Sequence, residues 1–339
     1  MDKTVIFAVA GSGKTTHIIN QLTLEKKALI ITYTNSNYDN LRRKIIEKWG
    51  YFPITIKLVN YFSFLYSFCY RPFLASKYNT KGINWKPNTN LFAVGQRRYI
   101  DSFSRLYSNR IAKFIVENNI LQDIIARFSK YFDVLYIDEV QDFAGHDFNF
   151  LRDISQTSID MLFVGDFYQH TFDTSRDGKV NKSLHDDYRK YMATFQAAGF
   201  VIDSATLLKS YRCSPTICQF ITDKIGIEIQ SHRADATLIT LVNDKVDAQR
   251  ILEDNQIVKL FYQEHYKYGC FSKNWGDCKG EDHYNDVCVI LNKTVLESYN
   301  AGRLKNLVPQ TRNKFYVACS RAKQNLYFIP HTLLTSIRH

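Results

Sequence analysis

The chain has 339 residues, of which 45% are hydrophobic and 23% charged, with only 14 Gly and 6 Pro. This composition excludes collagen-like and disordered classes, and the length suits two domains of ordinary size. Lys and Arg outnumber Asp and Glu by 44 to 33, a net charge of +11. Such an excess points to a polyanionic partner, usually nucleic acid, although an incidental basic bias or an anionic membrane would also fit.

The seven Cys residues are odd in number and form no CxxC pair. This usage is typical of reduced thiols in a cytoplasmic protein. A loose set comprises His265, Cys270, Cys278 and His283, but its spacing fits no common zinc pattern. No run of 18 apolar residues occurs and the N-terminus does not read as a signal peptide, so we expect no membrane partner.

The first half of the chain alternates short apolar strands with amphipathic helices. Thr4 to Ala8 reads as a strand, followed by a glycine loop and a helix from Thr15 to about Leu22. Further strands are predicted at 28–34, 54–59, 134–138 and 161–166, and helical spacing at 38–49. Buried strands that alternate with helices indicate a parallel sheet covered on both faces.

The alternation of strands and helices begins again in the second half, with predicted strands at 204–209, 237–242, 256–261, 286–291 and 325–329. We therefore expect an α/β protein with a first domain at 1–205 and a second at 206–339. No Pro- or Gly-rich linker marks the boundary, which predicts a tight hinge.

A basic, aromatic insertion is predicted at about 70–130. Its segment 71–113 holds nine Lys and Arg residues, among them Arg97 and Arg98, but one acid, Asp101, so it carries +8 of the total charge. Aromatic residues are interleaved with these cations. In single-strand binding proteins, cations contact the phosphates and bases stack on aromatic rings. The pattern therefore predicts a single-strand binding surface. A solvated insertion whose rings form a local core is the alternative.

Residues 8–15, AVAGSGKT, fit the phosphate-loop pattern with Ala8 in place of the first Gly. Such a loop turns backbone N–H groups toward phosphates, and the following helix adds its positive dipole end. In this pattern Lys14 reaches the β and γ oxygens and the Thr15 hydroxyl ligates Mg²⁺. The predicted nucleotide-binding residues of the loop are Ala10, Gly11, Ser12, Gly13, Lys14, Thr15 and Thr16.

The segment VLYIDEVQD at 134–142 supplies the second half of a triphosphate site. Asp138 ends a predicted buried strand, where it can hold Mg²⁺ through water. Glu139 follows it and can polarise the attacking water. ATP and Mg²⁺ are therefore the expected cofactors.

The order of motifs resembles superfamily 1 helicases of the UvrD/Rep group. Eight segments carry the resemblance: AGSGKTT, ITYTNSNYDNLRRKI, VNYFSF, IDEVQD, VGDFYQHTF, LLKSYRCSPTI, DCKGEDHYNDVCVIL and FYVACSRAKQNLYF. They cover both halves of the chain. The resemblance implies two RecA-like P-loop NTPase domains with parallel sheets and a nucleotide cleft between them.

The resemblance also implies roles for single residues. Gln169 would sense the γ-phosphate, and Arg212 and Arg321 would act as arginine fingers on it. Tyr211 would stack on the adenine, and Gly280 and Asp282 would lie near the ribose and phosphates. The residues implied to face the nucleic-acid strand are Tyr33, Thr34, Asn35, Phe62 and Phe172.

Four departures from the family pattern modify these expectations. The chain begins about seven residues before the phosphate loop, without room for the upstream glutamine motif, which predicts relaxed nucleotide selectivity. Only about 55 residues separate the Tyr211 region from Lys279, so the second-domain insertion is absent or vestigial. Thr174 stands where the family often has Trp, and Asp282 where it usually has Glu.

The leading hypothesis is an ATP-dependent translocase or helicase on single-stranded or partly duplex DNA, with 3′ to 5′ polarity implied by the resemblance. The first alternative is a DNA-stimulated NTPase sensor that works with a partner nuclease, as in bacterial anti-phage defence. The second is a nucleotide-gated binding module without turnover. RNA in place of DNA stays open, because backbone and stacking contacts suit both.

Overall fold

A computed structural model describes residues 2–88, 90, 92–171 and 179–334. The chain divides into two compact units. The first unit comprises Met1–Ile6, Thr15–Gly165 and Phe172–Asp203, and the second comprises Phe7–Lys14, Asp166–Thr171 and Ser204–His339. Two short segments from the first half of the sequence thus belong to the second unit, and the division predicted near residue 206 stays a prediction.

The first unit is built on a six-stranded sheet with the order β3-β2-β6-β7-β1-β8. The strands are β1 (Lys3–Phe7), β2 (Ala28–Thr32), β3 (Ile56–Asn60), β6 (Val134–Asp138), β7 (Asp160–Gly165) and β8 (Val201–Asp203). Ladders β2/β3, β2/β6, β6/β7 and β1/β8 are parallel. Every residue of β2 and β6 is buried, as an apolar run in a sheet covered on both faces requires.

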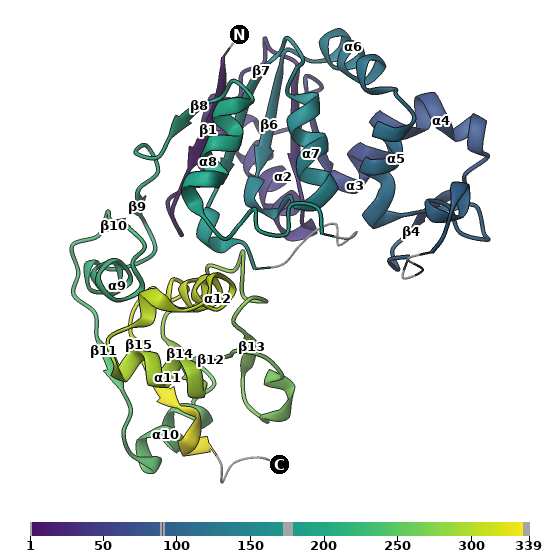
Figure 1. Ribbon diagram of the computed structural model, residues 1–339. Coiled ribbons are helices and arrows are strands. Elements are labelled where there is room, and N and C mark those ends of the chain that lie inside the picture. Colours follow the sequence, from purple (N-terminus) through teal and green to yellow (C-terminus); the bar gives the residue numbers. More distant parts are fainter. Residues whose placement is uncertain (1, 89, 91, 172–178, 335–339) are drawn as a thin grey trace. The chain divides into compact units, whose positions relative to one another are not determined.

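Helices cover both faces of this sheet: α7 and α8 lie on one face and α2 on the other (Figure 1). The helix α2 begins where the Thr34 side chain accepts the Asn37 N–H and ends at Gly50 with φ +78°, a paired N-cap and C-cap. The α-helices of this part of the first unit are α1 (Lys14–Gln21), α2 (Asn35–Trp49), α6 (Leu121–Tyr131), α7 (Gly145–Ile154) and α8 (Tyr188–Ala197).

The insertion between β3 and α6 folds as a group of short elements. The chain leaves β3 through α3 (Tyr61–Ser63), the π-helix η1 (Phe64–Tyr70) and α4 (Arg71–Tyr78). The strands β4 (Gly82–Asn84) and β5 (Arg105–Tyr107) form a separate parallel pair. Short 3₁₀ turns and α5 (Ile111–Glu117) complete it, and residues 118–120 separate α5 from α6.

The second unit holds a five-stranded parallel sheet with the order β11-β15-β14-β12-β13. Its strands are β11 (Ile239–Leu241), β12 (Val258–Phe261), β13 (Ser272–Asn274), β14 (Val287–Leu291) and β15 (Leu326–Pro330). A two-stranded parallel pair joins β9 (Lys209–Ser210) and β10 (Gln230–Ser231). The α-helices are α9 (Pro215–Phe220), α10 (Lys245–Glu253), α11 (Lys293–Asn300) and α12 (Pro309–Cys319).

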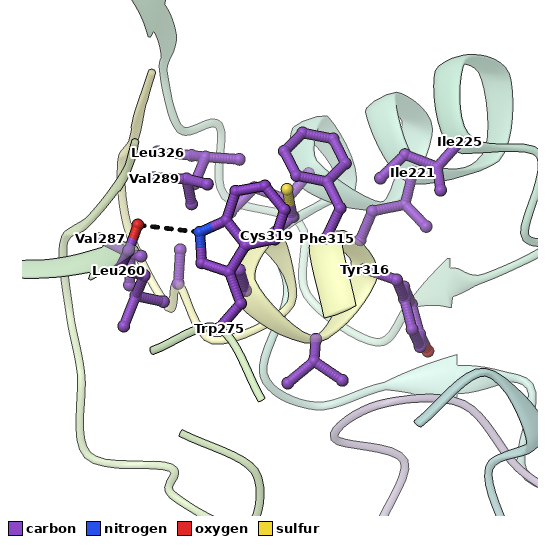
Figure 2. Packing of buried hydrophobic residues seen from close by; sticks show 14 of the residues in the cluster. Ile221, Ile225, Leu260, Trp275, Val287, Val289, Phe315, Tyr316, Cys319 and Leu326 are labelled. Carbon is purple, nitrogen blue, oxygen red and sulfur yellow. Dashed lines mark hydrogen bonds between the residues drawn. The ribbon is translucent and has the colours of Figure 1, made fainter. Parts of the chain in front are cut away.

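The core of the second unit centres on Trp275 (Figure 2). Its indole N–H donates to the carbonyl of Leu260 at 2.9 Å, and its ring centroid lies 5.4 Å from that of Phe315 on α12. Tyr316 belongs to the same cluster, with its hydroxyl oxygen turned away from Trp275 (Figure 2). This packing fixes α12, which carries residues of the candidate site.

The α/β class and the parallel sheets agree with the fold expected from the sequence. The strand predicted at 204–209 was wrong, since only Lys209 belongs to a strand, the short β9. Strands β4, β5, β8, β10 and β13 were not predicted. No helix in the described ranges is long and apolar enough to span a membrane.

Candidate functional site

The phosphate loop leaves β1 and enters α1, as its pattern predicts. Gly11 and Gly13 have φ of +70° and +86°, a backbone conformation that side chains rarely adopt. A Cβ atom on Gly11 would lie 2.6 Å from Cβ of Arg212 and 2.7 Å from Oγ of Ser210. Gly11 is therefore required both by its conformation and by the close approach of Arg212.

Thr15 and Asp138 both belong to the first unit. Asp138 is the last residue of β6 and is buried. The Met161 N–H at the start of β7 donates to the Asp2 carbonyl just before β1, so these two strands also run in the same direction. β1 and β6 therefore end at one edge of the sheet. A hydroxyl and a carboxylate are oxygen ligands of the kind that Mg²⁺ prefers, so the pair fits the predicted metal role.

Thr16 differs from Thr15 because its hydroxyl already has a partner in the protein. The Nζ of Lys44 on α2 donates to Thr16 Oγ1 at 2.7 Å. This bond ties the first turn of α1 to α2, so the structure gives Thr16 a stabilising contact beside its predicted role at the nucleotide.

Glu139 has a left-handed backbone, with φ 57° and ψ 51°. Non-glycine residues rarely adopt this conformation, and such strain is concentrated at functional sites. The side-chain amide of Gln141 donates to Glu139 Oε2. A Cβ atom on Gly165, at the end of β7, would lie 2.8 Å from Val140 Cγ1, so this glycine allows the Glu139 turn to pack against β7.

A chain of buried hydrogen bonds joins the phosphate loop to Gln169 within the second unit. The Ala10 N–H donates to the Tyr316 hydroxyl at 2.8 Å, and this hydroxyl donates to Asp166 Oδ2 at 2.9 Å. The Gln169 amide donates to the same oxygen at 2.8 Å. Burial raises the pKa of Tyr316 and the Asp166 carboxylate raises it further, so the phenol stays protonated and keeps donating.

Arg321 is 1% exposed and is held by two backbone carbonyls. Its Nε donates to Val317 at 3.1 Å, and its Nη1 to Glu281 at 2.9 Å. The buried Nη2 has no hydrogen-bond partner among the described residues. A fixed guanidinium with one unused buried nitrogen suits an anionic ligand.

Arg212 shares this environment. Burial and, next, the positive charge of Arg321 lower its pKa to about 10, while the carboxylate of Asp282 opposes the shift. Arg212 therefore stays charged at neutral pH. The structure brings Arg212 together with Arg321, Gly11 and the 280–282 loop, all of them residues singled out from the sequence.

Tyr211 presents a ring that is 64% exposed. Its N–H donates to the Gly11 carbonyl at 2.9 Å, and its ring stacks on the His232 imidazole with 3.9 Å between centroids and 13° between planes. The ring edge also lies close to Gly13. An exposed, pre-oriented ring beside the phosphate loop is compatible with base stacking.

In the first unit, Tyr33 and Phe62 lie together, with ring centroids 5.7 Å apart. Trp85 of the basic insertion packs edge-on against Phe62 at 5.1 Å and is itself largely exposed. Thr34 caps α2, and the Asn35 side chain accepts a bond from Asn60 at 2.7 Å, so both also have local structural roles. Phe172 and Thr174 lie outside the described residues.

The basic insertion mixes surface and structural cations. Arg97 is exposed, whereas the Arg98 guanidinium lies 5.7 Å from the Tyr99 ring centroid. Arg105 pairs with Asp101 at 2.8 Å, and the buried Arg110 donates to the Arg98 carbonyl. The insertion therefore has its own core and still exposes cations and rings, with a cavity of about 670 Å³ beside Arg97. Its exposed large aromatics are Trp85, Phe92 and Phe103.

Three contributors to this arrangement were not assigned roles from the sequence. Tyr316 and Gln141 stand inside quoted motifs, FYVACSRAK and IDEVQD, so their positions were a usable signal. His232 lies in no motif, and only the folded chain places it against Tyr211. In the described part of the chain, no three His, Cys, Asp or Glu side chains are grouped to hold a metal ion.

No family model matches the sequence, and no curated protein matches it. Several solved structures are similar to this protein. An arterivirus nonstructural protein 10 helicase in complex with DNA has a TM-score of 0.51 and 14% identity, covering 96% of this chain and 60% of that one. The PRRSV helicase has a TM-score of 0.50 and 14% identity, and the match covers 99% of this chain and 54% of that one. A crystal structure of the arterivirus nonstructural protein 10 helicase has a TM-score of 0.51 and 14% identity, and the match covers 99% of this chain and 62% of that one.

The fold thus resembles that of these helicases, and the α/β class with parallel sheets expected from the sequence is confirmed. At 14% identity the likeness concerns the fold. It does not single out the UvrD/Rep group that the motifs resemble. The chain spans between 54% and 62% of the length of these helicases.

Proposed function

We propose that this protein hydrolyses ATP with Mg²⁺ and uses the energy to move along single-stranded or partly duplex DNA, as a UvrD-like translocase or helicase with 3′ to 5′ polarity. One observation carries the proposal. Gly11 of the phosphate loop, Arg212 and Arg321 lie together in the second unit, with Gln169 joined to the same loop through Tyr316. These are the groups that γ-phosphate chemistry needs.

Each group has a defined part in the proposed hydrolysis. Lys14 and the loop N–H groups bind the phosphates, and the two arginines stabilise charge on the transferred phosphoryl. Thr15 and Asp138 would hold Mg²⁺, whose positive charge would offset the negative charge of the phosphates. Glu139 accepts a proton from the attacking water, and Gln169 responds to the γ-phosphate.

Nucleic-acid binding is supported by two independent observations. The insertion exposes aromatic rings and also exposes cations such as Arg97, and single strands are held by rings and cations of this kind. A helicase of the same fold has been solved with DNA. We propose that Tyr33, Phe62 and Trp85 contact bases, and that Arg97 and neighbouring cations contact phosphates.

A second candidate is a DNA-stimulated NTPase sensor that signals to a partner nuclease. The observation that favours it lies between Arg212 and Lys279. In this segment the structure forms α9, the π-helix η6 (Ile221–Ile225), β10, β11, α10, β12, the 3₁₀ turn η7 (His265–Lys267) and β13, which are elements of the second unit itself. No separate helical insertion that could grip duplex DNA stands among these described residues.

The deciding experiment is steady-state ATP hydrolysis with and without single-stranded DNA, at low and moderate salt. Strong stimulation supports a motor or sensor coupled to DNA, and a strand-displacement assay then separates the two. Hydrolysis without stimulation would contradict coupling to DNA. Absence of hydrolysis would contradict the enzyme and favour a nucleotide-gated binding module.

A further inference from the structure

A cavity of about 550 Å³ lies in the first unit beside β3, an edge strand of the six-stranded sheet. Its inner wall is apolar and includes Leu29, Val59, Phe64 and Phe68. Along β3 the buried Ile56 and Leu58 alternate with residues that face the cavity, as the two-residue period of a strand requires. The volume is in the range of ligand pockets and accommodates one or two bulky side chains.

The cavity reaches the end of the sheet opposite to the proposed nucleotide chemistry. Lys27, Thr55 and Phe132 line it, and they come just before β2, β3 and β6. The amino ends of parallel strands share one edge, whereas Thr34 and Glu139 follow the carboxyl ends of β2 and β6. The cavity is therefore a separate feature, and the inference below does not depend on the proposed function.

The charges around this cavity are all positive. Lys27, Lys57 and Arg127 line it, and no acidic residue does. The Arg127 guanidinium carbon lies 4.9 Å from the ring centroids of both Phe68 and Tyr131. Within the described ranges its side chain makes no hydrogen bond or ion pair, and its Nε is buried without a partner. A guanidinium held between two rings with all its donors unused is prepared for a carboxylate.

Two further lining groups lack partners. The buried Thr55 hydroxyl oxygen has no hydrogen-bond partner among the described residues, although buried polar groups are normally bonded. Ile54 on the rim is fully exposed, at 100%. An unused polar group inside an apolar cavity and an uncovered aliphatic side chain at its mouth both fit a surface that is covered by something else.

We propose that this cavity binds an acidic segment of a partner protein. The segment inserts one bulky apolar side chain against Phe68 and places a carboxylate on Arg127, with Lys27 and Lys57 attracting its other acids. A protein fits better than nucleic acid because Phe64 is buried and the other Phe rings are half-buried walls. Base stacking needs exposed ring faces, and phosphate binding needs no apolar cavity.

Fluorescence anisotropy with short fluorescein-labelled peptides tests whether the cavity binds an acidic segment. The probe carries Asp residues on both sides of a single Trp; one control peptide replaces Asp by Asn and another replaces Trp by Ala. The acidic Trp peptide binds saturably, and both controls bind more weakly. Arg127→Gln weakens binding about tenfold, the effect of one charge-assisted hydrogen-bonded pair. The matched variant is Lys130→Gln, which removes one charge from the same helix outside the lining and leaves binding unchanged.

Ser67→Trp provides a second test that keeps every charge. Ser67 is exposed on η1 and lines the cavity, so a large side chain there fills the space and abolishes peptide binding even where Arg127→Gln folds poorly. Equal binding of acidic and neutral peptides, no saturable binding, or full binding by both variants would overturn the proposal. So would an equal loss of oligonucleotide affinity in Arg127→Gln, because the occupant would then be nucleic acid.

Discussion

The hydroxyl of Tyr316 lies 2.8 Å from the backbone nitrogen of Ala10, although the two residues are 306 positions apart in the chain. The same hydroxyl donates to Asp166, which also accepts the Gln169 amide. One phenol thus holds a phosphate-loop N–H group and the carboxylate that orients Gln169. Any movement of the loop on nucleotide binding would change the bonding of Gln169 through this group.

Replacing Tyr316 by Phe removes that link while keeping the ring in the core. The Ala10 N–H and one Asp166 lone pair lose their partner, and an unsatisfied buried group costs about 1–3 kcal/mol of unfolding free energy. If ATP is hydrolysed as proposed, we expect kcat to fall about tenfold with a smaller change in KM, because Gln169 loses its orientation. Urea unfolding and steady-state kinetics measure the two effects.

Tyr70→Phe is the control for this change. Tyr70 is equally buried, and its hydroxyl shares a 2.9 Å hydrogen bond with Thr80, far along the chain from the phosphate loop. It should lose comparable stability and keep its kcat. Equal kinetic losses in both variants would show that Tyr316 acts through stability alone.

Gly11→Ala should disable the phosphate loop. The added Cβ would meet Arg212 and Ser210 at under 3 Å, and it would stand on a backbone with φ +70°. Gly302 offers a matched site, because it has φ +63° with nothing within 4 Å of a Cβ. Gly302→Ala should therefore lose only about 1 kcal/mol of unfolding free energy, because an Ala with a left-handed backbone is strained. It should keep its nucleotide affinity.

Binding of a fluorescent ATP analogue separates the two glycine variants. We expect at least a tenfold loss of affinity in Gly11→Ala, because Arg212 must move or the loop must open. If Gly11→Ala bound the analogue as well as Gly302→Ala does, the close packing of Arg212 on the loop would not matter for nucleotide binding.

The parts of the fold that the sequence predicted are those with a strong local signal. Strands β2, β6 and β14 are apolar runs that are buried throughout, and the glycine loop is defined by spacing. The strands that were missed have only two or three residues each, and the two at sheet edges have polar or exposed residues: Val201 of β8 is 67% exposed, and β13 reads Ser-Lys-Asn. Their pairing comes from neighbouring strands, which a local pattern does not contain.

In the candidate site, too, some features could be predicted from local motifs and others depend on the folded chain. Lys14, Glu139 and Gln169 stand in short motifs and could be named from them. The contacts of Tyr316 with Ala10, and of His232 with Tyr211, depend on how the chain folds back on itself. The Nη2 of Arg321 has no hydrogen-bond partner in the part of the chain that the structure describes, and this likewise follows from which carbonyls occupy its other nitrogens. Spacing along the chain carries none of this information.

Arg321→Lys tests whether the guanidinium geometry matters beyond its charge. Lysine keeps the positive charge but cannot donate to the Val317 and Glu281 carbonyls and to a phosphate oxygen at once. We expect turnover to fall about 100-fold or more, as when a transition-state donor is lost. The melting temperature should fall as well, since the carbonyls lose partners.

The conservative control is Arg303→Lys, an exposed arginine of the second unit. It should leave both turnover and melting temperature unchanged. If Arg321→Lys hydrolysed ATP at the rate of the unchanged protein, Arg321 would be a structural residue of α12 rather than an arginine finger.

Reversing exposed charges of the basic insertion should weaken DNA binding. In Arg71→Glu/Lys86→Glu/Arg97→Glu the affinity for a single-stranded oligonucleotide should drop. The slope of log affinity against log salt should also flatten by about 2, given a slope of about 0.7 per phosphate contact on single strands. Titrations at several salt concentrations measure both quantities.

Lys245→Glu/Lys293→Glu/Lys305→Glu makes the same charge change on exposed residues of the second unit. It should keep most of the salt slope, since these lysines lie outside the basic insertion. Equal losses in both triple variants would mean that net charge, and not the insertion, determines binding.

Glu139→Gln should separate ATP binding from ATP hydrolysis. The amide oxygen of a Gln can still accept the Gln141 side chain, so the strained turn with φ 57° should be retained. The amide cannot accept a proton from water, and general-base assistance contributes about 10²–10⁴-fold to a rate. We expect the nucleotide affinity to stay within about twofold and turnover to fall by at least 100-fold, measured by analogue binding and phosphate release. Glu253→Gln, an exposed change on α10, should alter neither, and full hydrolysis by Glu139→Gln would assign the base to another residue.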